Sequence, residues 1–284
     1  MSISLTSPNG LIEVQLGLYP DNTPVINFAE AWDANGGQID AMILRPASMQ
    51  EFFTGMMICE SIRERGSRVR NLVIPCIPGA RQDRIKWEGD MLFTIKYVAK
   101  AINDQHFDKV TTLDPHSMAT TALIDRLYVY DIRTVYVRLM SDVGYDHWDG
   151  VISPDFGAIK RAEDFSQVTN TFDFRKRPPA IPVFHGLKHR DPETNKLSGF
   201  SIDGLEAGKH YIVVDDLCDA GGTFLGLAEK IHDAGATADL FVTHGLFTKG
   251  TEHLAKAFSK IYATDSWPII HERVNYIKVT EGLI

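Results

Sequence analysis

The sequence of 284 residues has few cysteines. There are only three, Cys59, Cys76 and Cys218, and no two of them form a C-x-x-C pair. This number and spacing exclude a disulfide framework and argue against a zinc site built on cysteine. We therefore expect three reduced, buried thiols, which is typical of a cytoplasmic protein.

The sequence also lacks an excess of positive charge and any long apolar run. Lys+Arg number 29 against 37 for Asp+Glu, a net charge of −8, which argues against a protein that coats nucleic acid or an anionic membrane. No apolar run reaches the roughly 18 residues of a membrane span. The first ten residues, MSISLTSPNG, lack the basic and apolar regions of a secretory signal. We expect a cytoplasmic protein that binds neither nucleic acid nor membranes.

Apolar residues make up 44% of the chain, enough for a sizeable core, and segments typical of strands and helices alternate. Strands are predicted at 71–77, 109–113, 134–139, 150–153, 211–214, 240–243 and 261–264. Helices are predicted at 93–102, 117–126, 159–165, 223–234 and 252–258. Strands separated by helices imply right-handed βαβ units and mostly parallel sheets. We predict an α/β protein with two doubly wound domains, 1–142 and 143–284.

Polar residues follow four of the expected strands. They lie at 81–84 (RQDR), 114–117 (DPHS), 154–155 (PD) and 215–223 (DDLCDAGGT). Ligands of open parallel sheets bind beyond the carboxyl ends of the strands. Each cluster alone has an ordinary explanation, as a surface ion pair, a half-buried histidine or a turn aspartate. Four clusters at four strand ends indicate a binding site.

The segment 215–223 is the most specific of the four. Gly221 and Gly222 let a ligand approach the backbone closely, and Thr223 adds a hydroxyl at the start of a predicted helix, where a phosphate is favoured. Asp215 and Asp216 would repel a phosphate, but suit sugar hydroxyls or a bound cation. We therefore expect a ribose phosphate as the ligand. The alternative is a capped helix after a glycine turn, with solvated acids.

Residues 213–223 (VVDDLCDAGGT) resemble the ribose-phosphate loop of type I phosphoribosyltransferases and phosphoribosyl pyrophosphate synthetases. Residues 80–84 (ARQDR) resemble the ATP-binding stretch of the synthetases, which ordinary transferases lack. Further similar segments follow in family order: 113–116 (LDPH), 153–157 (SPDFG) with 160–162 (KRA), 243–247 (THGLF) and 264–266 (TDS). The chain thus resembles a short, divergent synthetase, which implies two domains of type I phosphoribosyltransferase-like architecture.

The resemblance implies a ribose-phosphate diphosphokinase. Such an enzyme transfers the β,γ-diphosphate of Mg-ATP to the anomeric hydroxyl of ribose 5-phosphate, giving phosphoribosyl pyrophosphate and AMP. The N-terminal domain would be the ATP side and the C-terminal domain the ribose-phosphate side, with the active site at their interface and Mg²⁺ as cofactor. A homo-oligomer, dimer or hexamer, is implied as well.

The same resemblance assigns roles to individual residues. The implied ATP-binding residues are Arg81, Gln82, Asp83, Arg84 and His116. The implied metal ligands are His116 and Asp155. The implied ribose-phosphate-binding residues are Asp215, Asp216, Asp219, Ala220, Gly221, Gly222 and Thr223.

A basic stretch completes the implied site. In the synthetases a loop with a K-x-R pair closes over the diphosphate, and the resemblance implies catalytic roles for Arg175, Lys176 and Arg177, together with His116. Alignment on the following prolines puts Arg175 at the position of the lysine, whereas a shifted register gives that role to Lys176. On its own, such a basic run is usually a solvated face.

Two departures from the family pattern leave alternatives open. The F-S-D-G-E loop that reaches the adenine of a neighbouring subunit has no clear counterpart; residues 28–30 (FAE) come nearest. Residues 185–200 are expected to form an added loop or hairpin beside the sugar site. The alternatives are therefore diphosphate transfer to a larger acceptor such as ADP-ribose, a phosphoribosyltransferase, or a non-catalytic regulatory relative.

Overall fold

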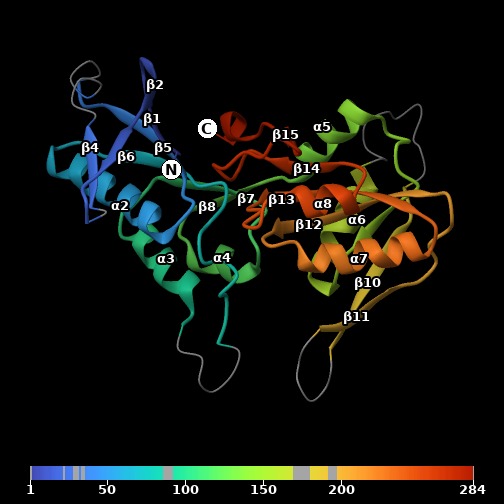
Figure 1. The fold of residues 1–284 in the computed structure, drawn as a ribbon. Helices are drawn as coiled ribbons and strands as arrows, with labels where there is room; N and C mark the ends of the chain where they lie inside the picture. Colours follow the sequence, from blue (N-terminus) through green and yellow to red (C-terminus); the bar gives the residue numbers. More distant parts are fainter. Residues whose placement is uncertain are drawn as a thin grey trace. The chain divides into compact units, whose positions relative to one another are not determined.

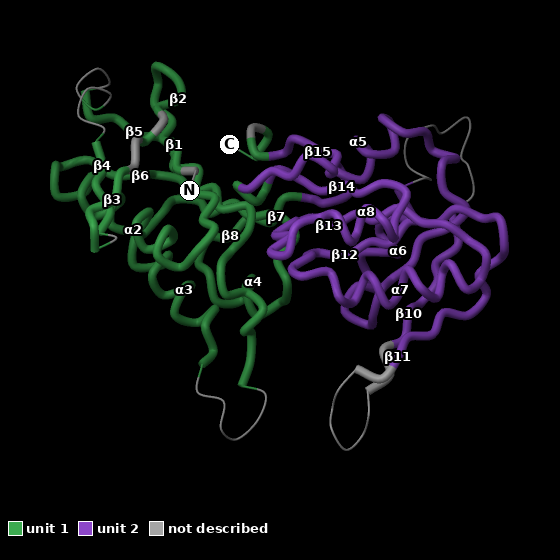
Figure 2. Tube along the Cα trace, in the orientation of Figure 1, with its two compact units in different colours: residues 1–130, 266–268, 280–284 green, residues 131–265, 269–279 purple. Residues whose placement is uncertain are grey.

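The computed structural model describes residues 2–21, 23–27, 32, 36–85, 92–168, 180–190 and 197–283. The chain divides into two compact units (Figure 2). Unit 1 comprises residues 1–130, 266–268 and 280–284, and unit 2 comprises residues 131–265 and 269–279. The first boundary therefore lies after Tyr130, twelve residues before the expected position 142/143.

Unit 1 contains a six-stranded sheet with the order β2-β1-β5-β6-β7-β8 (Figure 1). Its strands are β1 (Ser2–Ser7), β2 (Gly10–Glu13), β5 (Ile39–Arg45), β6 (Val69–Val73), β7 (Lys109–Leu113) and β8 (Leu127–Tyr130). The strands β5 to β8 are parallel, whereas β1 is antiparallel to both β2 and β5. A separate antiparallel pair is formed by β3 (Gln15–Leu18) and β4 (Pro24–Asn27). The helices are α2 (Met49–Glu64), α3 (Thr94–Asn103) and α4 (Met118–Leu123).

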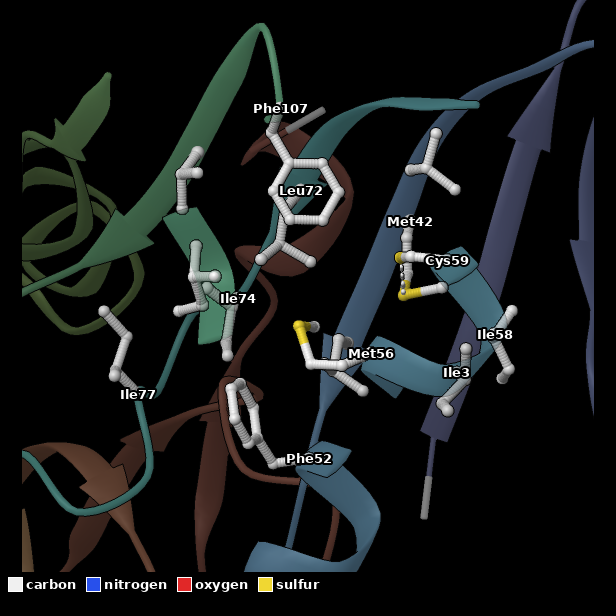
Figure 3. Packing of buried hydrophobic residues seen from close by; sticks show 14 of the residues in the cluster. Ile3, Met42, Phe52, Met56, Ile58, Cys59, Leu72, Ile74, Ile77 and Phe107 are labelled. Atoms are coloured by element: carbon white, nitrogen blue, oxygen red, sulfur yellow. Dashed lines mark hydrogen bonds between the residues drawn. The ribbon is translucent and has the colours of Figure 1, made fainter. Parts of the chain in front are cut away.

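Helix α2 shows how the local sequence sets the core of unit 1. The Ser48 hydroxyl accepts from the Glu51 amide at 3.2 Å, and the Glu51 carboxylate accepts from the Ala47 amide at 2.6 Å, which caps the helix start. Phe52 and Met56, one turn apart, then face the sheet together with Cys59, against strand residues such as Met42 and Leu72 (Figure 3). Cys59, Cys76 and Cys218 are free and buried, as predicted.

The opposite face of the unit 1 sheet is covered in part by the far end of the chain. Ile43 and Val73 pack against Tyr130 and against Leu283, which belongs to the short helix η2 (Thr280–Leu283). Leu283 is only 2% exposed. The core of unit 1 therefore includes a residue more than 150 positions after β8.

Unit 2 contains a seven-stranded sheet with the order β11-β10-β9-β12-β13-β14-β15 (Figure 1). Its strands are β9 (Gly150–Ser153), β10 (Val183–Arg190), β11 (Leu197–Ile202), β12 (His210–Cys218), β13 (Thr237–Gly245), β14 (Ile261–Thr264) and β15 (Asn275–Ile277). All neighbours are parallel except β10 and β11. The helices are α5 (Arg133–Val143), η1 (Phe156–Ala158), α6 (Ile159–Val168), α7 (Gly222–Asp233) and α8 (Glu252–Ala257).

Alternation along the strands of unit 2 buries both faces of the sheet. Leu240 and Val242 belong to one apolar cluster with Leu227 of α7 and Leu254 of α8. Phe241, which lies between the two strand residues, points the other way and contacts Tyr136 of α5, with ring centroids 5.5 Å apart. Helices on both faces of a mostly parallel sheet confirm the predicted doubly wound α/β fold.

The strand predicted at 134–139 is wrong, because these residues lie in α5. The alternating Val135 and Val137 suggest a strand, but the buried residues are Val135, Tyr136, Leu139 and Met140, which is the spacing of a helix. Tyr136 packs on Phe165 of α6 at 5.0 Å, so α5 belongs to unit 2 and the boundary falls before it. The preceding residues 127–130 form β8, a strand that the sequence pattern did not indicate.

The described parts of the added segment, 185–190 and 197–200, pair as antiparallel strands, as expected of a hairpin. Gly186 on β10 pairs with Ile202 on β11, and His185 pairs with Ser153 at the end of β9. A Cβ on Gly186 would lie 3.0 Å from the Ser153 carbonyl oxygen, so only glycine allows this close approach. None of the helices within the described residues has both the length and the hydropathy that a membrane span requires.

Candidate active site

In unit 1 the structure brings together two of the polar clusters predicted from the sequence. β6 and β7 are parallel neighbours, so the segments that follow them leave the sheet at the same edge. The Leu113 amide donates to the Pro75 carbonyl at 3.1 Å, and the Thr112 hydroxyl donates to the same oxygen at 3.2 Å. The segments 81–84 and 114–117 are thereby placed side by side.

Asp83 is the centre of this cluster. The Arg84 guanidinium donates to both of its carboxylate oxygens at 2.7 Å. The Arg84 hydrogen bonds lower the pKa of Asp83 to about 2, with smaller contributions from the Ser117 hydroxyl and the His116 charge. Asp83 is only 7% exposed. Asp83 therefore orients Arg84, and the side chains offered to a ligand are those of Arg81, Gln82, Arg84 and His116, all of which are exposed.

Replacing Asp83 with asparagine is expected to lower the free energy of unfolding at neutral pH by about 1 kcal/mol or less, because Arg84 is largely exposed. A carboxyl whose pKa falls from 3.8 to about 2 on folding stabilises the protein above pH 3.8, and this contribution is lost as the pH falls through 2. The difference between the two proteins should therefore shrink in acid.

Urea denaturation over this pH range measures the effect. The control is Asp104→Asn, which removes an exposed pair with Lys100 in the same unit. A difference between wild type and Asp83→Asn that stays constant with pH would contradict the assignment.

In unit 2 three carboxyl groups gather at the carboxyl ends of β9 and β12. Asp155 follows β9, where its side chain accepts from the Gly157 amide at 2.9 Å. Asp215 lies on β12, and one of its carboxylate oxygens accepts from the Asp216 amide at 2.8 Å. Burial, together with the negative charges of Asp216 and Asp155, raises the pKa of Asp215 well above its ordinary value. Such a cluster of oxygen ligands attracts a hard divalent cation.

Arg161 is a residue of this cluster that was not among the predicted site residues. Its guanidinium lies 3.8 Å from the carboxylate of Asp216 and donates to the Gly157 carbonyl at 3.2 Å. Both side chains of the Arg161–Asp216 pair are mostly buried. The sequence carried a signal for it, because Arg161 is part of the 160–162 segment. Asp216 is thus held toward Arg161 inside the unit, whereas Asp215 and Asp219 are half-buried.

The loop after β12 has the geometry that the glycines predict. Gly221 has φ +82°, and a Cβ there would lie 3.0 Å from the imidazole of His253 and from Leu254. At Gly222, the first residue of α7, a Cβ would meet nothing within 4 Å. The first amides of α7 have no acceptor inside the helix and are available to an anion. Gly221 is thus required by the fold, and Gly222 leaves space beside the helix start.

Hydrogen bonds from residues 246–248 hold this loop in place. The Leu246 and Phe247 amides donate to the Cys218 carbonyl at 2.9 and 3.1 Å. The Thr248 hydroxyl donates to the Asp219 carboxylate at 2.6 Å. The loop is therefore held in place by β13 and the residues that follow it, before any ligand binds.

Some predicted site residues cannot be placed in either cluster. Arg175, Lys176 and Arg177, as well as residues 28–30, lie outside the described residues. The structure thus brings together the predicted residues within each unit: Asp83, Arg84 and His116 in unit 1, and Asp155, Asp215 and Asp216 in unit 2.

No family model matches the chain. A ribose-phosphate pyrophosphokinase of Cereibacter sphaeroides is 27% identical over 254 residues, which cover 84% of this chain and 70% of the relative. A ribose-phosphate pyrophosphokinase of Pyrococcus furiosus is 24% identical over 279 residues, or 94% and 90% of the two chains.

The fold has a counterpart among solved structures. The phosphoribosylpyrophosphate synthetase of Mycobacterium smegmatis superposes with a TM-score of 0.75 at 19% identity, over 95% of this chain and 87% of that one. The two units thus define an α/β protein of phosphoribosyltransferase-like architecture. The sequence relatives and this fold together support membership of the ribose-phosphate pyrophosphokinase family.

Proposed function

We propose that the protein is a ribose-phosphate diphosphokinase that converts Mg-ATP and ribose 5-phosphate into phosphoribosyl pyrophosphate and AMP. The anomeric oxygen of the sugar would attack the β-phosphorus of ATP and lose its proton. The bond from that phosphorus to the α,β-bridging oxygen would break, and AMP would leave with this oxygen. The proposal rests on one observation: unit 2 contains both the carboxyl cluster around Asp215 and a helix N-terminus, at Gly222, with free space beside it.

Unit 2 is proposed as the ribose-phosphate side. The 5-phosphate would bind the amides of Gly221, Gly222 and Thr223 at the start of α7, where the helix dipole favours an anion. Asp215 and Asp219 would accept hydrogen bonds from the sugar hydroxyls. Because Thr248 donates to Asp219, this carboxylate is oriented before the sugar arrives.

Unit 1 is proposed as the ATP side. Arg81, Arg84 and His116 offer exposed donors to the nucleotide and its phosphates, and Gln82 offers an amide. Asp83 would act through Arg84, because its carboxylate is occupied by the guanidinium. Arg175, Lys176 and Arg177 are proposed as the catalytic cations over the diphosphate, which gains charge as the bond to AMP breaks.

Mg²⁺ is proposed as the cofactor. The residues fit this ion, since Asp155 contributes a hard oxygen ligand near Asp215, whose pKa is raised by burial and by the negative charges of Asp216 and Asp155. His116 is the proposed metal contact of unit 1. The bound ion would neutralise negative charge on the diphosphate. We also propose that the enzyme is homo-oligomeric and cytoplasmic and acts in nucleotide biosynthesis, as the resemblance implies.

The proposal is tested by AMP release from Mg-ATP with ribose 5-phosphate, with ADP-ribose, and without an acceptor. We expect AMP with ribose 5-phosphate and none without an acceptor, because the site has donors for one sugar phosphate. AMP formed only with ADP-ribose would support diphosphate transfer but would contradict ribose 5-phosphate as the acceptor. Absence of AMP in every reaction would overturn the proposed activity.

A further inference from the structure

A second group of polar residues lies at the opposite edge of the unit 2 sheet. His210 is the first residue of β12, Asp239 is near the start of β13, and His147 precedes β9 by three residues. These three strands are neighbours in the sheet, and β12 and β13 can be followed side by side in Figure 1. His210 precedes Asp215 by five strand residues, about 16 Å, so the group is distinct from the candidate active site.

The distances within this group exceed those of hydrogen bonds. The Nε2 atoms of His147 and His210 lie 3.4 and 3.3 Å from the same atom, Oδ2 of Asp239. A charge-assisted hydrogen bond between such groups is about 2.7–2.9 Å long. By contrast, ligand atoms bound to a tetrahedral zinc ion at about 2.0–2.2 Å are separated by about 3.4 Å. The spacing therefore fits common ligation of one cation.

Unsatisfied polar atoms at the same place are a second observation. Asp239 is fully buried, and its Oδ1 has no hydrogen-bond partner within the described part of the chain. The same holds for Nε2 of His147 and for the buried Tyr262 hydroxyl. Trp148 donates to Oδ2 of Asp239 at 3.0 Å, which leaves Oδ1 bare. A buried carboxylate with a bare oxygen beside two imidazoles is costly unless a cation completes it.

The surroundings hold the two imidazoles in position. Nδ1 of His210 lies 2.8 Å from the Thr237 hydroxyl, which leaves Nε2 to face Asp239. The carboxylate of Asp149 accepts from the His210 amide at 2.8 Å, and the Asp149 amide donates to the His210 carbonyl at 2.7 Å. These bonds fix the segment that carries His147 to the start of β12. Orientation of a ligand histidine through its second nitrogen is typical of metal sites.

We propose that His147, His210 and Asp239 form a binding site for one zinc-like divalent cation, which ties together the starts of β9, β12 and β13. Two imidazoles and one carboxylate suit Zn²⁺ or Co²⁺ better than Mg²⁺, which prefers oxygen ligands. Both histidine side chains are partly exposed, 29% and 24%, which places the group close to solvent, and a water molecule would supply the fourth ligand.

The test is binding of Co²⁺ and Zn²⁺ to chelator-treated full-length protein in saturating Mg²⁺, which occupies oxygen-ligand sites. Visible absorption of Co²⁺ reports its geometry, and calorimetry with Zn²⁺ gives the number of sites. We expect one site that gives a tetrahedral Co²⁺ spectrum. His147→Ala and His210→Ala should each weaken its affinity at least about tenfold, and Thr237→Val about tenfold through the orientation of His210.

The matched control is His232→Ala, which removes an exposed histidine on α7 of the same unit. It should leave the spectrum and the affinity unchanged. His147 lies in a partly exposed loop, and the fold of its variant is checked by circular dichroism. Wild type without such a site would overturn the proposal. Equal affinities in wild type and His147→Ala, or equal losses in His147→Ala and His232→Ala, would overturn it as well.

Discussion

Replacing Asp215 with asparagine is expected to slow AMP release strongly and, at the same time, to raise the melting temperature of the ligand-free protein. The carboxylate is held against Asp216 and Asp155, and burial and these negative charges raise its pKa. Asparagine keeps the shape and removes the charge. We expect a loss of kcat of at least about a hundredfold, because the neutral amide no longer adds negative charge beside the Mg²⁺ proposed at Asp155 and is a weaker acceptor for the sugar.

The pH dependence of stability follows from the direction of this shift. A carboxyl whose pKa is higher in the folded than in the unfolded state costs stability as the pH rises above its ordinary value of 3.8. Asp215→Asn should therefore match wild type in acid and exceed it at neutral pH. A gain of about 1 kcal/mol corresponds to about 2–4 °C in a protein of this size.

Thermal unfolding at several pH values, with and without Mg²⁺, measures the effect, and Mg²⁺ should stabilise wild type more than the variant. The control is Asp233→Asn, which removes an exposed carboxylate paired with Lys230. It should change neither activity nor the pH dependence. A variant that is both inactive and less stable than wild type at neutral pH would contradict the proposed role, since it would indicate a structural carboxylate.

Replacing Gly222 with valine is expected to raise the KM for ribose 5-phosphate at least about tenfold, or about 1.4 kcal/mol of binding free energy. A Cβ at this position meets nothing within 4 Å in the described part of the chain, so the valine methyl groups are expected to occupy the space that we assign to the phosphate. Binding of Mg-ATP should change little, because its proposed residues lie in unit 1. Initial-rate kinetics and ATP binding by calorimetry separate the two effects.

Two glycine variants serve as controls for this experiment. Gly282→Val also places a side chain in open space, but in η2, and should leave both substrates unaffected. Gly221→Val should instead destabilise unit 2, because φ is +82° and the side chain would strike His253 and Leu254. An unchanged KM for ribose 5-phosphate in Gly222→Val would show that the phosphate binds elsewhere.

The sequence predicted the parallel core of both units best. The strands at 109–113, 150–153 and 261–264 form with the expected bounds, since each is a short apolar run between polar turns. The strand predicted at 134–139 is wrong because the segment ends at Leu139. Met140 is the next residue, and its burial together with Leu139 reveals the helical period. The capping pair Ser48 and Glu51 would have indicated α2, which the predicted elements, beginning at residue 71, omit.

The candidate site was predictable where its residues follow strands that are neighbours in the sheet. Asp155 and Asp215 meet because β9 pairs with β12, and the predicted alternation of strands and helices favours such an edge. The pairing of Arg161 with Asp216 depends on how α6 packs against β12, which no local pattern specifies. For the same reason the group of His147, His210 and Asp239 could not be found from spacing, since its members are 29 to 92 residues apart.

The path of the chain also bears on how the protein is made. Residues 266–268 and 280–284 belong to unit 1, and Leu283 is buried with Ile43 and Val73. On the ribosome, residues 131–265 therefore emerge before the last side chains of the unit 1 core are available. One face of the unit 1 sheet therefore remains incompletely covered while most of unit 2 is synthesised. During this interval the uncovered apolar residues of that face favour aggregation and chaperone binding.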